Sequence, residues 1–98
     1  MGKFVFTYYA GKSDGGSNEA WGAWFGVLGD KLVDGGNPFG DDGRAVSSEG
    51  VMAVKDMPVT GYSIVNSDSM EAATELAKGC PLVASGEGAV CVYEALPM

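Results

Sequence analysis

The sequence of 98 residues has no histidine, and it has only six lysine and arginine residues against thirteen aspartate and glutamate. Without histidine, neither a Ser-His-Asp triad nor a Cys-His pair can form, and the commonest general base and metal ligand are missing. The net charge of -7, with no basic cluster, repels phosphate backbones and anionic membranes. We therefore expect neither nucleic acid nor a membrane surface as a partner.

Long apolar runs, targeting segments and metal motifs are also missing. No stretch approaches the roughly 20 apolar residues that span a bilayer, and the first residues lack the regions of a signal peptide. Cys80 and Cys91 form no Cys-x-x-Cys motif, so we expect buried structural thiols rather than a zinc or redox site. The sequence predicts one domain over residues 1–98, in the cytoplasm, with no metal and no cofactor.

Short strands are predicted where β-branched and aromatic residues alternate or run together. They lie at residues 3–9, 32–34, 44–48, 51–55, 61–67 and 89–96. Segments 44–48 and 51–55 are predicted to form a hairpin across Glu49-Gly50. Three of the strands are apolar on both faces, so both sides of the sheet need to be covered.

A first helix is predicted over residues 19–32, after Asn18 as its cap. Its apolar residues fall within one arc of the helix: Trp21, Trp24, Phe25, Leu28 and Leu32. A neighbouring stripe holds three glycines, Gly22, Gly26 and Gly29. Because glycine destabilises a helix interior, we expect this stripe to pack on the sheet, with close approach of a ligand or second chain as the alternative.

A second helix is predicted to follow Asp68 and Glu71, which have the spacing of a capping box. Gly79 and Pro81 are expected to end it. The order strand, helix, strands, helix, strand predicts an α+β sandwich of the ferredoxin-like kind. Two helices cover one face of such a sheet, so we expect a second copy to cover the other, giving a homodimer with its sheets face to face.

Polar residues with catalytic potential gather around a glycine-rich loop after the strand at 32–34. Asp34 is a candidate general base, and Arg44 is a candidate electrostatic partner for it or for an anionic substrate. The alternative is that Asp34 caps backbone amides of its own turn, and that Asp41 and Asp42 are solvated turn residues. The sequence leaves both interpretations open.

A ligand pocket is predicted between the first helix, the loop at 34–44 and the sheet. Its candidate ligand-binding residues are Tyr8, Trp24, Asn37, Phe39 and Tyr62. The alternative for most of the aromatic residues is that they fill the core, since a chain this short has few other large side chains.

Four blocks of sequence carry a family resemblance. They are LVDGGNPFG at 32–40, GYSIVNSDS at 61–69, ELAKGCP at 75–81 and VYEALPM at 92–98. Over residues 20–98 the chain resembles the YCII-related proteins, in the subgroup named for a DGPF motif, to which Asp34 to Phe39 corresponds loosely. The resemblance implies a ferredoxin-like fold paired as a dimeric α+β barrel.

The resemblance also bears on activity. Some relatives look like enzymes built on a His and Asp pair in the cleft between the sheets, and in this chain only Asp34 has a counterpart there. Members of the DGPF subgroup are often thought to be small-molecule or regulatory proteins. We therefore expect a cytoplasmic homodimer that binds a small molecule or has a regulatory role. Alternatives are a lyase or isomerase using Asp34 and Arg44, and a dimerisation domain without a ligand, so the sequence leaves open whether the chain is an enzyme.

Overall fold

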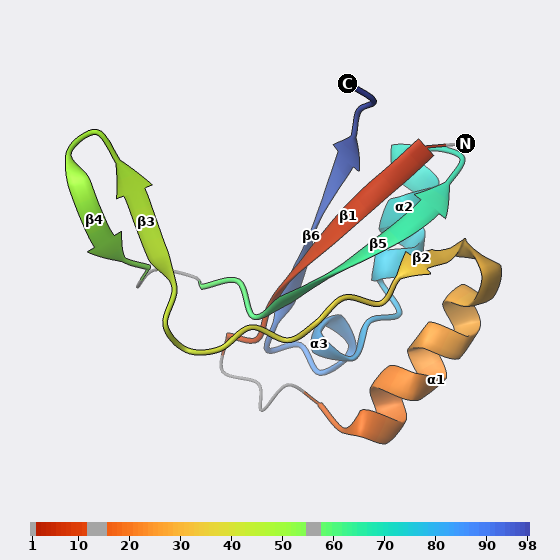
Figure 1. The fold of residues 1–98 in the computed structure, drawn as a ribbon. Helices are drawn as coiled ribbons and strands as arrows, with labels where there is room; N and C mark the ends of the chain where they lie inside the picture. The colour runs from red at the N-terminus through yellow and green to blue at the C-terminus, as the bar shows by residue number, and fades with distance from the viewer. Residues whose placement is uncertain (1, 12–15, 55–57) are drawn as a thin grey trace.

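The structure is a computed structural model, and it describes residues 2–11, 16–54 and 58–98. Over these residues the chain forms an α+β fold (Figure 1). The elements are β1 (Gly2–Tyr9), α1 (Asn18–Leu28), a 3-10 turn (Gly29–Lys31), β2 (Leu32–Asp34), β3 (Arg44–Ser47), β4 (Gly50–Ala53), β5 (Gly61–Ser67), α2 (Met70–Ala77), α3 (Pro81–Ala84) and β6 (Ala89–Ala95). Within the described part of the chain, no helix has the length and hydropathy of a transmembrane segment.

The main sheet has four antiparallel strands in the order β2-β5-β1-β6. Its centre is β1, where Val5 lies opposite Ile64 of β5 and Tyr93 of β6. Strands β3 and β4 pair only with each other as a hairpin, and its turn is at Ser48-Glu49, one residue before the predicted Glu49-Gly50. The predicted α+β class is confirmed, and β5 has the bounds that its alternating residues predict.

The core lies between the sheet and the helices. Alternate residues of β1 point into it, and Phe6 is fully buried because successive side chains of a strand face opposite sides. Trp24 of α1 stacks on Phe6 with ring centroids 6.0 Å apart, and its Nε1 donates a hydrogen bond to the carbonyl oxygen of Leu76 at 3.1 Å. Trp24 therefore joins α1 to both the sheet and α2.

Both predicted helix caps are wrong by one residue. Ser17 caps α1, because its hydroxyl accepts a hydrogen bond from the Ala20 amide at 3.1 Å. In α2 the hydroxyl of Ser69 accepts from the Ala72 amide at 3.0 Å. Serine, aspartate and asparagine are all good caps, so residue type does not decide between neighbouring positions. The cap is the residue with the extended backbone conformation, which is Ser17 in α1 and Ser69 in α2.

The helix ends also differ from the prediction. Helix α1 stops at Leu28 because Gly29 has a φ of 53°, a conformation that favours glycine. Pro81 does not simply end the second helix; it opens a third, α3, at a first-turn position where proline loses no helical hydrogen bond. Packing of the glycine stripe on the sheet is wrong, because an added Cβ at Gly22 or Gly26 would meet nothing within 4 Å.

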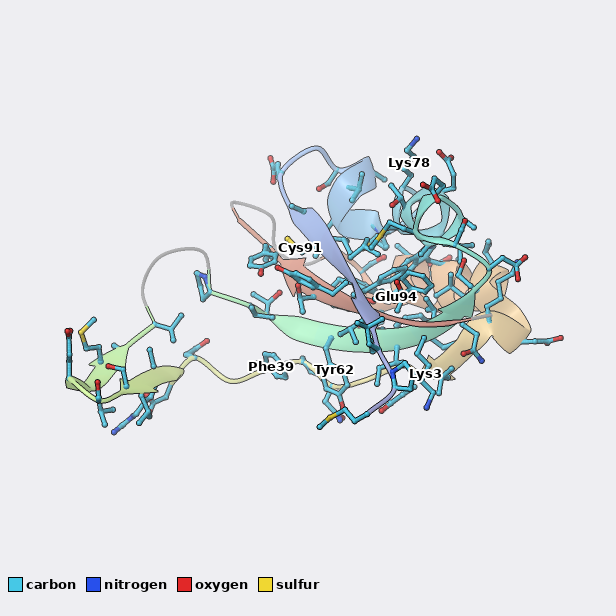
Figure 2. The ribbon with its side chains drawn as sticks, turned by 90° about the horizontal axis from the view of Figure 1, so that it is seen from above. Lys3, Phe39, Tyr62, Lys78, Cys91 and Glu94 are labelled. Carbon is cyan, nitrogen blue, oxygen red and sulfur yellow. The ribbon has the colours of Figure 1, made fainter. Side chains whose placement is uncertain are left out.

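The helices lie on one side of the main sheet, and the other side carries none of the described helices (Figure 2). We call this second side the open face. In β1, β5 and β6 it consists of Lys3, Val5, Thr7, Tyr9, Tyr62, Ile64, Asn66, Ala89, Cys91, Tyr93 and Ala95. The hairpin β3–β4 projects from the body as an arm (Figure 1), and all its strand residues are exposed.

Candidate functional site

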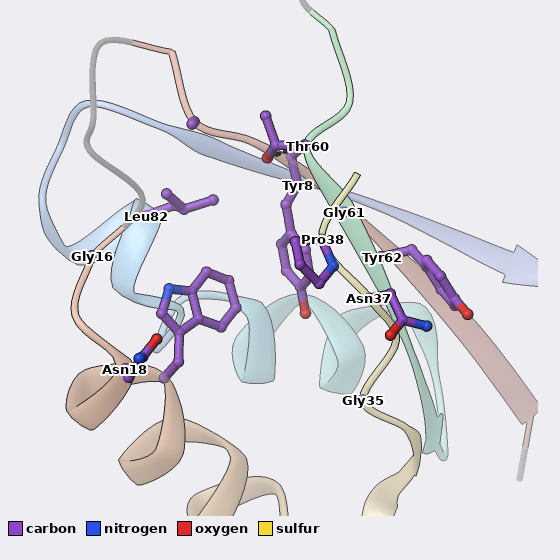
Figure 3. A pocket seen from close by; sticks show the side chains of 12 residues that line it. Tyr8, Gly16, Asn18, Gly35, Asn37, Pro38, Thr60, Gly61, Tyr62 and Leu82 are labelled. Carbon is purple, nitrogen blue, oxygen red and sulfur yellow. Dashed lines mark hydrogen bonds between the residues drawn. The ribbon is translucent and has the colours of Figure 1, made fainter. Parts of the chain in front are cut away.

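A cavity of about 480 Å³ lies where β1 ends and β5 begins. The sheet contributes Tyr8, Gly61 and Tyr62 to its lining, and α1 contributes Asn18 and Trp21. The loop after β2 contributes Gly35, Asn37 and Pro38. In Figure 3, Asn18 and Leu82 lie on one side of this first cavity, and Asn37 and Tyr62 on the other. The structure thus places a cavity between the three elements that the sequence predicted would enclose it.

A chain of buried hydrogen bonds fixes one wall of the first cavity. The Tyr8 hydroxyl donates to Ser63 Oγ at 2.7 Å, and Ser63 Oγ donates to the Gly35 carbonyl oxygen at 2.7 Å. Ser63 is fully buried, and Tyr8 is 5% exposed. These bonds tie the loop after β2 to the two central strands, so the cavity wall is preorganised.

Burial raises the pKa of the Tyr8 phenol, although its hydrogen bond with Ser63 opposes the shift. The phenol is therefore neutral at physiological pH. The remaining lining is also uncharged, because none of the described lining residues is Asp, Glu, Lys or Arg. The ring of Trp21 meets Tyr8 edge-on with centroids 4.9 Å apart, and the amides of Asn18 and Asn37 add polar groups. Such a lining suits an uncharged molecule with an apolar part.

Tyr8→Phe should change the pH dependence of stability. Because the folded-state pKa of Tyr8 is raised, its contribution is present below the unfolded pKa of about 10 and is lost as the pH rises further. We expect the variant to be about 1–2 kcal/mol less stable at pH 7, with a smaller deficit at pH 11. Urea unfolding at both pH values measures this difference. Thr74→Val is the control, because it removes an exposed hydroxyl on α2, away from the first cavity and the open face.

A second cavity, of about 610 Å³, lies at the base of the arm and shares Pro38 and Thr60 with the first. Its lining includes three charged residues, Asp41, Asp42 and Arg44, beside apolar residues such as Phe39 and Val54. The Arg44 guanidinium binds both carboxylate oxygens of Asp42, with Nε–Oδ1 at 3.2 Å and Nη2–Oδ2 at 3.0 Å. Both side chains are well exposed, so this ion pair adds little to stability.

The predicted ligand-binding residues divide between the core and the two cavities. Tyr8, Asn37 and Tyr62 line the first cavity. Trp24 does not, since it is buried in the core. Phe39 lines the second cavity instead, and its ring stacks on Tyr62 with centroids 5.8 Å apart.

Sequence reasoning missed Asn18 as a lining residue, and it did not single out Trp21 from the other aromatic residues that could line a pocket. Trp21 lies one helical turn before Trp24, on the same apolar arc of α1. The signal that could have found it is its place in the first turn of the helix, next to the glycine-rich segment that precedes α1. A side chain there lies near the end of β1, whereas Trp24 lies over the middle of that strand against Phe6.

The structure does not assemble the predicted pair of Asp34 and Arg44. Asp34 Oδ1 accepts a hydrogen bond from the Gly36 amide at 2.8 Å, within its own turn, and Asp34 lines neither cavity. Arg44 is paired with Asp42. Asp34 therefore shows the alternative role of a turn cap, and this geometry gives no general base next to an electrostatic partner.

The two cysteines are free thiols. Cys80 is buried, as predicted, and burial raises the pKa of its thiol, which makes it unreactive. Cys91 is only half-buried, on the open face. Among the residues that the structure describes, no three His, Cys, Asp or Glu side chains are grouped so as to hold a metal ion.

The chain was compared with family models, curated proteins and solved structures, and none of them matches it. The resemblance to the YCII-related proteins therefore stays a prediction.

Proposed function

We propose that this chain is a cytoplasmic homodimeric domain that binds a small, uncharged molecule in the first cavity. One observation carries the proposal. In a chain of net charge -7, the described residues that line a cavity of about 480 Å³ are all uncharged, and several of them are aromatic. Cavities of roughly 300–1,000 Å³ hold small-molecule ligands. The free thiols are also typical of a cytoplasmic protein.

The chemistry of the lining defines the ligand class. A flat apolar group would pack against the Trp21 and Tyr8 rings. Hydrogen-bonding groups on the ligand would meet the amides of Asn18 and Asn37, which can donate and accept. An anion would gain no ion pair from this lining and would be repelled by the acidic surface. The ligand is therefore a neutral, ring-bearing molecule.

The homodimer and the finer fold are part of the same proposal. The main sheet and its helices follow the order β1-α1-β2-β5-α2-β6, and this order supports a ferredoxin-like split βαβ arrangement. The open face is without helices and contains Val5, Ile64 and Tyr93. Two such faces packed together would bury these residues and form the dimeric barrel of the YCII-related proteins.

Intrinsic fluorescence tests the ligand proposal, because the sequence has two tryptophans and Trp21 lines the first cavity. The probes are uncharged aromatic and heteroaromatic compounds of roughly 10 to 20 non-hydrogen atoms. We expect some of them to change the emission and to raise Tm. The double variant Asn18→Ala/Asn37→Ala should bind them at least about 10-fold more weakly, since two hydrogen-bonding groups are lost.

Thr74→Ala is the control, because it removes an exposed hydrogen-bonding side chain on α2, outside the first cavity and the open face. Its affinity should stay within about twofold of the wild type. Two results would contradict the proposal. One is a compound set in which nothing binds, and the other is binding that is equally tight in the double variant and the wild type.

A further inference from the structure

The arm, residues Arg44–Ser47 and Gly50–Ala53, is an apolar hairpin that the rest of the described chain leaves uncovered. Val46 is 75% exposed and Met52 is 69% exposed. A two-stranded hairpin on its own is marginally stable in water, and exposed apolar patches mark interaction sites. The arm therefore has the character of a surface that packs on a partner.

Each face of the arm carries apolar side chains, and Arg44 lies on the same face as Val46. On one face Val46 lies opposite Val51, and on the other Ala45 lies opposite Met52. A contact with a single flat surface would cover only one of these pairs. A partner that contacts the arm on both faces would bury both pairs.

The charge distribution favours a second copy of this chain as that partner. Between residues 44 and 53 the only charged side chains are Arg44 and Glu49, so the arm has no net charge. On the open face as defined in β1, β5 and β6, the only charged residue is Lys3. Two copies of net charge -7 repel each other. Contact through the arm and the open face brings few carboxylates together, so this repulsion is weakest there.

The area available also points to a role for the arm. A strand residue covers about 16 Å² of a sheet, so the three long strands, of 8, 7 and 7 residues, project about 350 Å² on the open face. A stable interface buries about 800 Å² on each partner. The arm's two faces add about 260 Å². The arm therefore raises the projected area that a second copy can contact from about 350 to about 610 Å², which brings it closer to the size of a stable interface.

The arm lies where a second copy can reach it. Figure 2 shows it beyond one end of the main sheet, on the side away from the helices. A copy seated on the open face is therefore on the same side as the arm. In a two-fold dimer each arm would extend along the other copy, so the contact is made twice.

We infer that the β3–β4 hairpin is a dimerisation arm that packs on a second copy of this chain. The inference rests on the proposed homodimer and adds to it the surface that makes the dimer stable. It predicts that removing the apolar character of the arm weakens the dimer while each chain stays folded.

The test is the double variant Val46→Glu/Val51→Lys. These residues lie directly opposite each other, so the new charges attract across the strands and preserve the hairpin. Sedimentation equilibrium over a dilution series gives the dimer dissociation constant. We expect it to rise at least about 100-fold, since two apolar side chains per copy are lost from the interface. Val27→Lys is the control, because Val27 lies on α1 and is 76% exposed.

Each outcome decides the inference. Val27→Lys should dissociate like the wild type, and circular dichroism should show that both variants are folded. If the wild type dimerises and the double variant has the same dimer dissociation constant, the arm inference is overturned and the homodimer stands. A wild type that is monomeric at about 100 µM, well above the Kd of a standard interface, would overturn both. If only a different protein binds the arm, the choice of partner is wrong.

Discussion

Replacing Gly36 with alanine should lower the free energy of unfolding by more than about 3 kcal/mol. Gly36 has a φ of 75°, and a Cβ there would overlap the carbonyl oxygen of Tyr62. That oxygen belongs to β5 in the sheet, so it cannot move away without breaking strand pairing. Both the backbone conformation and the space therefore require glycine.

Gly22→Ala is the matched control for Gly36→Ala. Gly22 lies in α1 and is exposed, and a Cβ there meets nothing within 4 Å. Since alanine is favoured over glycine in a helix interior, we expect a gain of about 0.5–1 kcal/mol. Urea unfolding of the wild type and both variants measures the changes. Equal stability of Gly36→Ala and the wild type would show that the loop after β2 does not lie against β5 as described.

The Gly36 variant also bears on the function, because Gly35 and Asn37 on either side line the first cavity. Asp34 accepts a hydrogen bond from the Gly36 amide. This bond fixes the turn that contains Gly35, Gly36 and Asn37. Where the variant stays folded, a displaced turn would move the Asn37 amide. We expect such a protein to bind the neutral probe compounds more weakly than Gly22→Ala does.

The strands could be predicted from sequence because their signal is local. In β5, residues Tyr62, Ile64 and Asn66 alternate with Ser63, Val65 and Ser67, and this pattern gave the correct bounds. The same alternation puts Phe4, Phe6 and Tyr8 of β1 on one face, and these three residues are buried. These features depend only on the period of a strand.

Other features depend on contacts between distant parts of the chain. Whether Asp34 faces a cavity or its own turn depends on where β2 pairs with β5, and the sequence left both open. Trp21 and Trp24 share one arc of α1, and the packing of α1 on β1 decides which one reaches the cavity. The two strands of the arm were predicted to form a hairpin, and they do. The local sequence pattern does not show whether this hairpin joins the main sheet or stands apart from it.

Trp24→Ala should lower the free energy of unfolding by about 3–5 kcal/mol. Trp24 is 4% exposed and contacts the rings of Phe6 and Tyr8 with centroids 6.0 and 6.2 Å away. Its removal would leave a cavity between α1 and the sheet. Trp24→Phe keeps an aromatic ring and loses the hydrogen bond to Leu76, so we expect a smaller loss, of about 1–2 kcal/mol. The Leu76 carbonyl keeps the Gly79 amide as a donor at 3.2 Å, which limits this loss.

Ligand binding by Trp24→Phe separates the core role of Trp24 from the binding role that the sequence predicted. Trp24 does not line the first cavity, whereas Trp21 does. We expect Trp24→Phe to bind the neutral probe compounds within about twofold of the wild type, and Trp21→Ala to bind them at least about 10-fold more weakly, because a ring that packs on the ligand is lost. Thermal shift and fluorescence titration measure both. If the folded Trp24→Phe protein lost affinity as strongly as Trp21→Ala, the ligand would contact Trp24, and the cavity would have to extend into the core.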